Sequence, residues 1–382
     1  MSGGRNDLWQ RLDALVDRAP RPDDLIAHRL QMHAVSRYRR IGRDVPAVLA
    51  SLEAPTVATN LALEPFLARI KAATEAPLLV VKGPEVAARF PDPMLRPFSD
   101  VDVLVDGAER VREELLAAGF FEVGEAEKYV GIHHLRPLAV GALPLVVELH
   151  HTPKWLAGTP GPTVRELLAL ARPSAMQVEG FLALPPAAHA VVVAVHSWAH
   201  RPLRRIGDLL DIALLVEAED REEAEQWARA WGVSRVWRTT MAAVEATFGG
   251  QRVPLSTRTW ARNIRDVRGR TVFENHLERW FSGWWQLPPG QALVQTAHRA
   301  LADVRPADGE TWSSKLRRSA TAARRASVRV GEHEHALRRN DRSTPNVDRD
   351  PRPSTRSKVP VHSFSEFGER RDGAARRQIR GR

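Results

Sequence analysis

The segment Ser99-Asp100-Val101-Asp102-Val103-Leu104-Val105 is the feature that most restricts how this chain can fold. Its β-branched residues predict a strand, and because side chains alternate along a strand, Asp100 and Asp102 share one face. Two neighbouring carboxylates repel each other, which favours a shared cation. Oxygen ligands of this kind suit Mg²⁺ or Mn²⁺, which often complete their coordination with substrate phosphates and water. The pattern therefore predicts phosphoryl or nucleotidyl transfer.

The composition allows a large folded body. A chain of 382 residues that is 43% hydrophobic has room for two or three domains with an ample core. The sequence contains no cysteine, which excludes disulfides, thiolate metal sites and cysteine nucleophiles. The first residues lack an apolar signal core, and no apolar run is long enough to cross a bilayer. We therefore expect a cytoplasmic protein without a membrane partner.

The net charge of +10 belongs to the end of the chain, because 19 Lys and Arg residues but only 8 Asp and Glu residues follow Ser314. The preceding residues are close to neutral, which argues against a dedicated tRNA or DNA substrate. From about Arg305 the apolar residues become rare, which predicts a disordered Arg-rich tail, with residues 314–330 as a candidate basic helix. Such a tail could make weak, nonspecific contact with nucleic acid.

The coarse pattern along the chain predicts an α/β (α+β) fold with a small mixed sheet flanked by helices. Helices are expected over residues 7–72 and 109–118, with a helical turn at 85–90. Strands are expected over residues 78–81, 100–105, 129–140 and 145–150. From about Val164 to Ala300 the pattern is helical, with candidates at 189–199, 206–216, 221–230, 236–247 and 292–301.

Two further features could act together with the Asp pair, one on a metal and one on phosphates. Glu148 follows an apolar run, as a neighbouring strand would place it, and could be a third metal-binding carboxylate. The alternative is an edge-strand glutamate that faces water. Lys82-Gly83 follows a buried strand, where a lysine and a close backbone could meet phosphates, although a lone Lys-Gly pair is a weak signal.

The histidines leave several interpretations open. His150 would share the face of Glu148 and could lie near the metal site, or it could end the strand in water. His196 and His200 are one helical turn apart, which permits a zinc pair, although core or substrate-pocket roles are favoured because no third ligand is evident. His133 and His134 are expected to form a surface pair.

Four segments in order resemble a known family. They are Leu79-Val80-Val81-Lys82-Gly83-Pro84-Glu85-Val86-Ala87, Pro91-Asp92-Pro93-Met94-Leu95-Arg96, Ser99-Asp100-Val101-Asp102-Val103-Leu104-Val105 and Val147-Glu148-Leu149-His150-His151. Together with His196-Ser197-Trp198-Ala199-His200 and Arg205-Ile206-Gly207-Asp208-Leu209-Leu210-Asp211-Ile212-Ala213, they resemble the uncharacterised nucleotidyltransferase family of the DNA polymerase beta-type superfamily. The resemblance spans about residues 55–300.

The resemblance implies roles for individual residues. It implies that Asp100, Asp102 and Glu148 are catalytic and bind Mg²⁺ or Mn²⁺. It implies nucleotide contacts for Lys82, Gly83, Arg96 and Ser99, where Arg96 could instead be a surface residue that closes the loop. A substrate pocket would include His150, His196, His200, Arg205 and Asp211.

The chain departs from the wider superfamily at two positions. Pro84 stands where a serine or glycine follows the glycine, so one backbone amide is missing. Glu148 replaces the more usual aspartate. We therefore predict a metal-dependent nucleotidyltransferase that uses an NTP, ATP by default, and a small-molecule, peptide or protein acceptor. The alternatives are a nucleotide-binding or regulatory protein without turnover and a toxin that modifies tRNA or protein.

The pattern along the chain and the resemblance together predict four parts. They are an N-terminal helical segment (1–54), a nucleotidyltransferase catalytic core (55–160), a helical domain (161–304) that would cover the cleft, and the basic tail (305–382).

Overall fold

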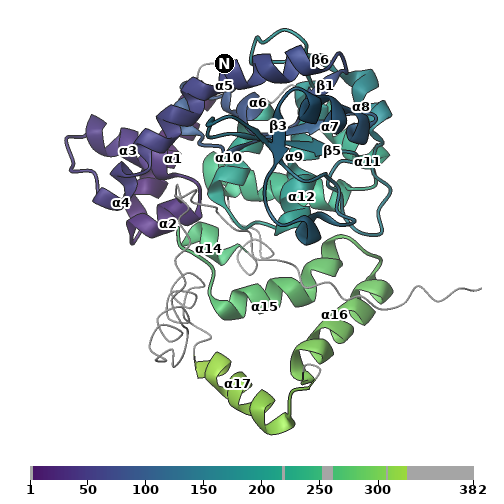
Figure 1. Cartoon of the computed structure of the whole chain (residues 1–382). Coiled ribbons are helices and arrows are strands. Elements are labelled where there is room, and N and C mark those ends of the chain that lie inside the picture. Colours follow the sequence, from purple (N-terminus) through teal and green to yellow (C-terminus); the bar gives the residue numbers. More distant parts are fainter. Residues whose placement is uncertain (1–2, 217–219, 252–260, 307–308, 325–382) are drawn as a thin grey trace, which may run out of the picture.

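A seven-stranded mixed sheet lies among helices in the upper part of the computed structural model, which describes residues 3–216, 220–251, 261–306 and 309–324 (Figure 1). The strand order is β3-β4-β5-β2-β1-β7-β6. The strands are β1 (Leu78–Val80), β2 (Asp100–Leu104), β3 (Phe120–Glu122), β4 (Leu138–Val140), β5 (Val146–His150), β6 (Arg172–Pro173) and β7 (Phe181–Ala183). The pairs β2/β5 and β1/β7 are parallel and the others are antiparallel.

One face of the sheet packs on two helices, α5 (Glu53–Ala73) and α7 (Ala108–Ala117). The residues that alternate with the aspartates of β2, Val101 and Val103, are fully buried in this core with Phe66 of α5. Because a strand has a period of two, this packing turns the aspartates toward the opposite face. The valines thus determine which side of the sheet carries the acidic groups.

The other face of the sheet lies against a larger helical layer, into which Leu79 and Leu104 are packed. Its helices are α8 (Val164–Leu170), α9 (Pro186–His200), α10 (Ile206–Leu215), α11 (Arg221–Ala230) and α12 (Ser234–Val244), followed by the π-helical turn η3 (Glu245–Gly249). Helix α9 is almost entirely apolar and buried, which is expected for a helix covered on all sides. Its His189 donates from Nε2 to the carbonyl of Val81 at 2.7 Å and so ties the helix to the end of β1.

Helices also form the N-terminal part and the last described part of the chain. The first are α1 (Gly3–Arg18), α2 (Pro22–Ala27), α3 (Gln31–Arg40) and α4 (Ala47–Ala50). Between β1 and β2 lie α6 (Pro84–Ala87) and the 3₁₀ turn η1 (Pro93–Leu95), and η2 (Ala126–Tyr129) follows β3. The last are α14 (Arg262–Arg265), α15 (Val272–Phe281), η4 (Ser282–Trp285), α16 (Pro289–Val304) and α17 (Trp312–Arg324). Figure 1 shows α16 and α17 extending away from the sheet.

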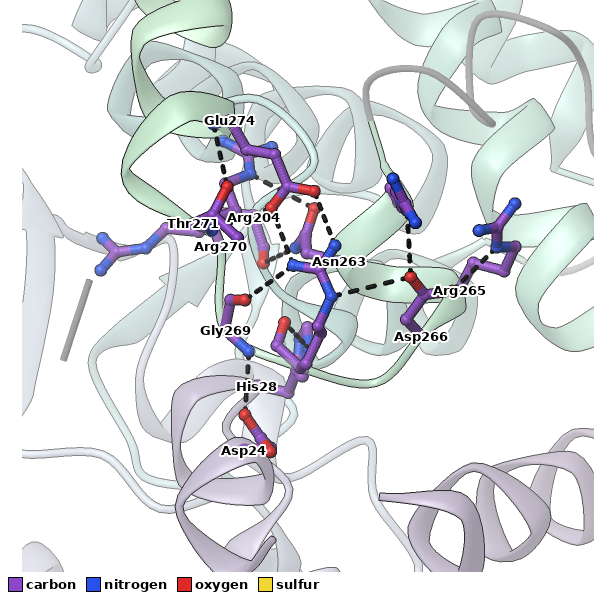
Figure 2. A network of polar contacts seen from close by, with 12 residues as sticks. Asp24, His28, Arg204, Asn263, Arg265, Asp266, Gly269, Arg270, Thr271 and Glu274 are labelled. Atoms are coloured by element: carbon purple, nitrogen blue, oxygen red, sulfur yellow. Dashed lines mark hydrogen bonds and ion pairs between the residues drawn. The ribbon is translucent and has the colours of Figure 1, made fainter. Parts of the chain in front are cut away.

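A polar network joins α2 to the beginning of α10 and to the segment around α14 (Figure 2). The Nε2 atom of His28 donates to the carbonyl of Arg268 at 3.0 Å, and its Nδ1 accepts from the amide of Ile206 at 3.2 Å. The carboxylate of Asp24 accepts from the amide of Gly269 at 3.0 Å. These contacts hold three distant parts of the sequence together.

The structure confirms the predicted α/β fold with a mixed sheet flanked by helices. The strand expected over residues 129–140 is wrong for most of its length, because only Leu138–Val140 is a strand and the preceding residues form η2 and a loop. Gly131, with a φ of 67°, and Pro137 interrupt the extended pattern there. The short strands β3, β6 and β7 were not expected. The strands β6 and β7 come from the region after Val164, which was expected to be helical, and they extend the sheet.

Helix α17 overlaps the basic helix expected over residues 314–330, while the rest of the tail lies outside the described residues. Within the described part of the chain, no helix combines the length and the apolar character needed to cross a membrane.

Candidate active site

The parallel pairing of β2 and β5 assembles the site. The register aligns Asp102 with Glu148 and Leu104 with His150. Asp100 begins β2, two residues before Asp102, and therefore belongs to the same face. The acidic groups of two strands that are far apart in the sequence thus lie side by side.

Three side chains place possible metal ligands in one group. Ligand atoms of Asp102, Glu148 and His150 all lie within 4.8 Å of one another. The Nε2 atom of His150 lies 3.1 Å from Oδ1 of Asp102 and 3.7 Å from Oε2 of Glu148. Asp102 and His150 are buried, whereas Glu148 is partly exposed, so the group is open to solvent on the Glu148 side.

The pKa values of these groups reflect their crowding. Burial, together with the charges of Asp102 and Glu148, raises the pKa of Asp100 to about 6. Burial acts in the same direction on Asp102, but the hydrogen bond and charge of His150 bring the pKa of this carboxyl below its usual range. Burial alone would lower the pKa of His150, yet its hydrogen bonds to the two carboxylates raise it to about 9. The carboxylates therefore attract positive charge strongly enough to hold a proton on a buried imidazole.

A divalent cation fits this donor set, because two carboxylates converge at a negative, partly open position. Of the three predicted carboxylates, the structure brings Asp102 and Glu148 together directly. Asp100 lies outside this group of ligand atoms, on the same face at the beginning of the strand, and interacts electrostatically with both.

The Lys82-Gly83 turn lies beside the acidic residues. The charge of Lys82 lowers the pKa values of Asp100 and Asp102, which places its ammonium group near both. Gly83 has a φ of 59°, and a Cβ atom there would lie 2.5 Å from the carbonyl oxygen of Asp100. Only glycine combines this backbone conformation with such close approach to β2. Pro84 then begins α6 as its first residue, a position where its missing N–H breaks no helical hydrogen bond.

Arg96 stabilises this turn through a hydrogen bond to its backbone. Its Nε and Nη2 atoms donate to the two carboxylate oxygens of Asp211 at 2.7 and 2.8 Å, and its Nη1 donates to the carbonyl of Gly83 at 2.9 Å. Both side chains are buried. The sequence indicated both as nucleotide or substrate contacts, whereas the structure places them in contact with each other. It excludes the alternative that Arg96 is a surface residue.

His133 and His134 correct another expectation, because they do not form a surface pair. His134 is buried and its Nε2 lies 3.8 Å from Oε2 of Glu148. The rings of His133 and His134 lie 5.2 and 5.0 Å from the ring of His150. A β-bridge joins His134 to His150. The two histidine pairs, each in a segment predicted to be extended, are the one feature of the sequence that could have suggested this contact.

His196 and His200, at the end of α9, continue this group of histidines. Their Nε2 atoms are 3.0 Å apart, and the Nζ atom of Lys154 lies 2.7 Å from Nδ1 of His200. The ring of His133 lies 6.5 Å from that of His196. Burial, followed by the charge of Lys82, lowers the pKa of His196 well below its ordinary value, so this imidazole is neutral at neutral pH.

Arg205 and Ser99 occupy the margins of the site. Arg205 precedes α10 and lowers the pKa of Asp208, on which Arg29 acts more strongly. Ser99 is exposed, and its carbonyl accepts from the amide of Val146 at 3.3 Å. Arg29 was not expected at the site; its Nη1 lies 3.8 Å from Oδ1 of Asp208, and its charge lowers the pKa of Asp100. No local pattern marks such a residue, because it comes near the site through contacts of the residues after α2 with the beginning of α10.

Carboxylates on adjacent parallel strands beside a lysine–glycine turn are typical of enzymes that bind cations and handle phosphates. The family model described as Uncharacterised nucleotidyltransferase matches residues 24–249, more than half of the chain. The chain therefore belongs to the uncharacterised nucleotidyltransferase family, as its motifs had indicated, and it is a nucleotidyltransferase. No curated protein and no solved structure matches it.

Proposed function

We propose that this protein transfers a nucleoside monophosphate from an NTP to a hydroxyl group of a small molecule, a peptide or another protein. The acceptor hydroxyl gives its proton to solvent and its oxygen forms a bond to the α-phosphorus, the bond from the α-phosphorus to the bridging oxygen breaks, and pyrophosphate leaves. The observation that carries the proposal is the register of β2 and β5, which sets Asp102 beside Glu148 and near Lys82. Family membership supports the same reaction class.

The cofactor in this proposal is Mg²⁺ or Mn²⁺. Bound by Asp102 and Glu148, with Asp100 beside them, a divalent cation would neutralise phosphate charge and lower the pKa of the acceptor hydroxyl. The protein itself supplies position. Lys82 provides a fixed positive charge for the phosphates, and the Gly83 turn lets them approach the backbone. Orientation of this kind can supply much of the rate enhancement in phosphoryl-group chemistry.

The charge of the residues before Lys315 bears on the class of acceptor. The near-neutral charge of the residues before Lys315 supports an acceptor other than nucleic acid, since phosphate contacts provide most nucleic-acid affinity. The buried, neutral His196 and the neighbouring His200 supply a polar wall for such an acceptor. ATP is the first donor to test.

The test uses each of the four NTPs labelled with ³²P at the α-phosphate, with Mg²⁺ or Mn²⁺, in the presence and absence of a cell lysate. We expect label on an acceptor with the unsubstituted protein and none with Asp100→Asn or Asp102→Asn. Asp106→Asn is the matched control, because Asp106 follows the same strand but is exposed and pairs with Arg165 at 2.8 Å.

Two results would contradict the proposal. Label that arrives from the γ-phosphate instead of the α-phosphate would indicate phosphoryl transfer. Tight NTP binding without label transfer under every condition would favour the alternative of a nucleotide-binding protein without turnover. The observation that favours this alternative is Pro84, which follows the Lys82-Gly83 turn and has no backbone N–H to donate to a phosphate.

A further inference from the structure

Two imidazoles accompany the carboxylates at the candidate metal site. His150 is only 2% exposed, and its Nε2 atom is directed at both Asp102 and Glu148. Its ligand atom belongs to the same 4.8 Å group as the carboxylate oxygens. His150 is therefore placed as a third donor around one point, where a bound cation would displace the proton that Nε2 shares with the two carboxylates.

The second imidazole has its tautomer fixed by the backbone. The Nδ1 atom of His134 lies 2.8 Å from the carbonyl of Leu135, and because a carbonyl only accepts, Nδ1 carries the proton. In the neutral ring Nε2 then presents a lone pair, and it lies 3.8 Å from Oε2 of Glu148. Two electron-pair donors that face each other are stabilised by a cation between them. Histidines that bind metals commonly donate their other N–H to a carbonyl in this way.

These donors differ from an all-carboxylate site in the metals they favour. Carboxylate oxygens alone suit Mg²⁺, which is bound reluctantly by nitrogen ligands. Imidazole nitrogen favours first-row transition ions, and mixed oxygen and nitrogen donors suit Mn²⁺ and its heavier neighbours.

We propose that Asp102, Glu148 and His150, with His134 beside Glu148, form a mixed carboxylate–imidazole centre that binds Mn²⁺ in preference to Mg²⁺. This inference rests on the cation site of the proposed function, but it assigns a nitrogen ligand and a metal preference that nucleotidyl transfer alone does not require. Metal binding in the absence of any nucleotide therefore tests it separately.

The direct test is pulsed electron paramagnetic resonance of the full chain loaded with Mn²⁺ and no nucleotide. We expect electron-spin-echo modulation from a histidine ¹⁴N nucleus coupled to the ion, shifted to the ¹⁵N pattern in protein grown with ¹⁵N-histidine. The unsubstituted protein is sufficient for this measurement, so it does not depend on the folding of a variant.

Variants then identify the nitrogen. His150→Gln should lose the part of the ¹⁴N modulation that comes from His150, leaving at most that of His134, and should weaken Mn²⁺ binding by about tenfold or more, the range found when the surroundings of a metal are disturbed. It should leave Mg²⁺ binding nearly unchanged, so the preference for Mn²⁺ falls by a similar factor. His151→Gln is the matched control, because His151 is the next residue, is exposed and contacts the carbonyl of Ile132 at 2.8 Å.

Bound Mn²⁺ without nitrogen modulation, or a His150→Gln variant with unchanged Mn²⁺ affinity and spectrum, would overturn the inference and leave His150 as a partner of Asp102 only. Nucleotidyl transfer supported by Mg²⁺ would survive that outcome. Conversely, nitrogen-coupled Mn²⁺ in a protein that transfers no nucleotide would support the mixed centre and reject the proposed function.

Discussion

Arg96 and Asp211 form a buried ion pair with two hydrogen bonds, of 2.7 and 2.8 Å, and the third bond of Arg96 reaches the carbonyl of Gly83. One guanidinium therefore links α10 to the turn that carries Lys82. A planar guanidinium can make these three bonds at once, whereas an ammonium group cannot reproduce the fork. The position of the Lys82-Gly83 turn thus depends on an arginine that also binds α10.

Arg96→Met should lower the free energy of unfolding by about 3–5 kcal/mol, because it leaves the carboxylate of Asp211 buried without a partner. The double variant Arg96→Met/Asp211→Leu should recover most of this loss. Its KM for the NTP should nevertheless stay raised, since the carbonyl of Gly83 still lacks its donor. Urea unfolding and steady-state kinetics separate the two effects. Full recovery of both stability and KM would show that the pair has no role in positioning the turn.

Gly83→Ala should abolish most NTP-dependent activity and reduce stability, because the new Cβ atom would lie 2.5 Å from the carbonyl oxygen of Asp100. Gly141→Ala is the matched control. Gly141 has a φ of 58°, close to the 59° of Gly83, but a Cβ atom there meets nothing within 4 Å. The control should show only the backbone strain of about 1–2 kcal/mol. Equal losses of activity in the two variants, compared by thermal unfolding and label transfer, would contradict this assignment.

The carboxylates of the site could be predicted from local sequence because a strand has a fixed period. The alternation in residues 100–105 determines that Asp100 and Asp102 share a face, and the valines between them determine which face is buried. Predicting Glu148 required the further assumption that its apolar run forms a strand next to the strand of Asp100 and Asp102. The register of β2 and β5 confirms that the two strands are adjacent.

The surroundings of the site could not be predicted in the same way. Arg96 and Asp211 are 115 positions apart, and the hydrophobic pattern reports which residues are buried but not which buried residues meet. Both residues could therefore be predicted as candidates, but their pairing could not. His134 was missed for a different reason, since residues 129–137 form a turn and loop whose burial comes from contact with β5 and not from any periodicity of their own.

Bound metal should stabilise the folded protein measurably. A cation that binds only the folded state raises the free energy of unfolding by about 2.7 kcal/mol at a concentration 100 times its Kd. We expect this increase with Mn²⁺, its reversal by EDTA, and its absence in Asp102→Asn, which lacks one of the converging carboxylates. Asp106→Asn should respond as the unsubstituted protein does. The thermal midpoint recorded against Mn²⁺ concentration measures the effect, and an equal increase in Asp102→Asn would place the bound ion elsewhere.

Acid should weaken the junction around His28. Burial lowers the pKa of His28 from 6.5 to about 4 in the folded protein, and the geometry agrees, because a protonated Nδ1 would face the amide proton of Ile206. The unfolded chain therefore binds more protons than the folded one between these values. The stabilising contribution is complete above pH 6.5 and is lost as the pH falls toward 4.

The loss from this one group should reach about 2 kcal/mol at pH 5 and about 3 kcal/mol in full. His28→Gln retains an acceptor and a donor but does not titrate, so it is the control in which this contribution is absent. Urea unfolding of both proteins at pH 7.5 and pH 5 gives the difference directly. If the two proteins lose the same stability over that interval, the imidazole of His28 is already protonated in the fold, and its contact with Ile206 cannot be the hydrogen bond described above.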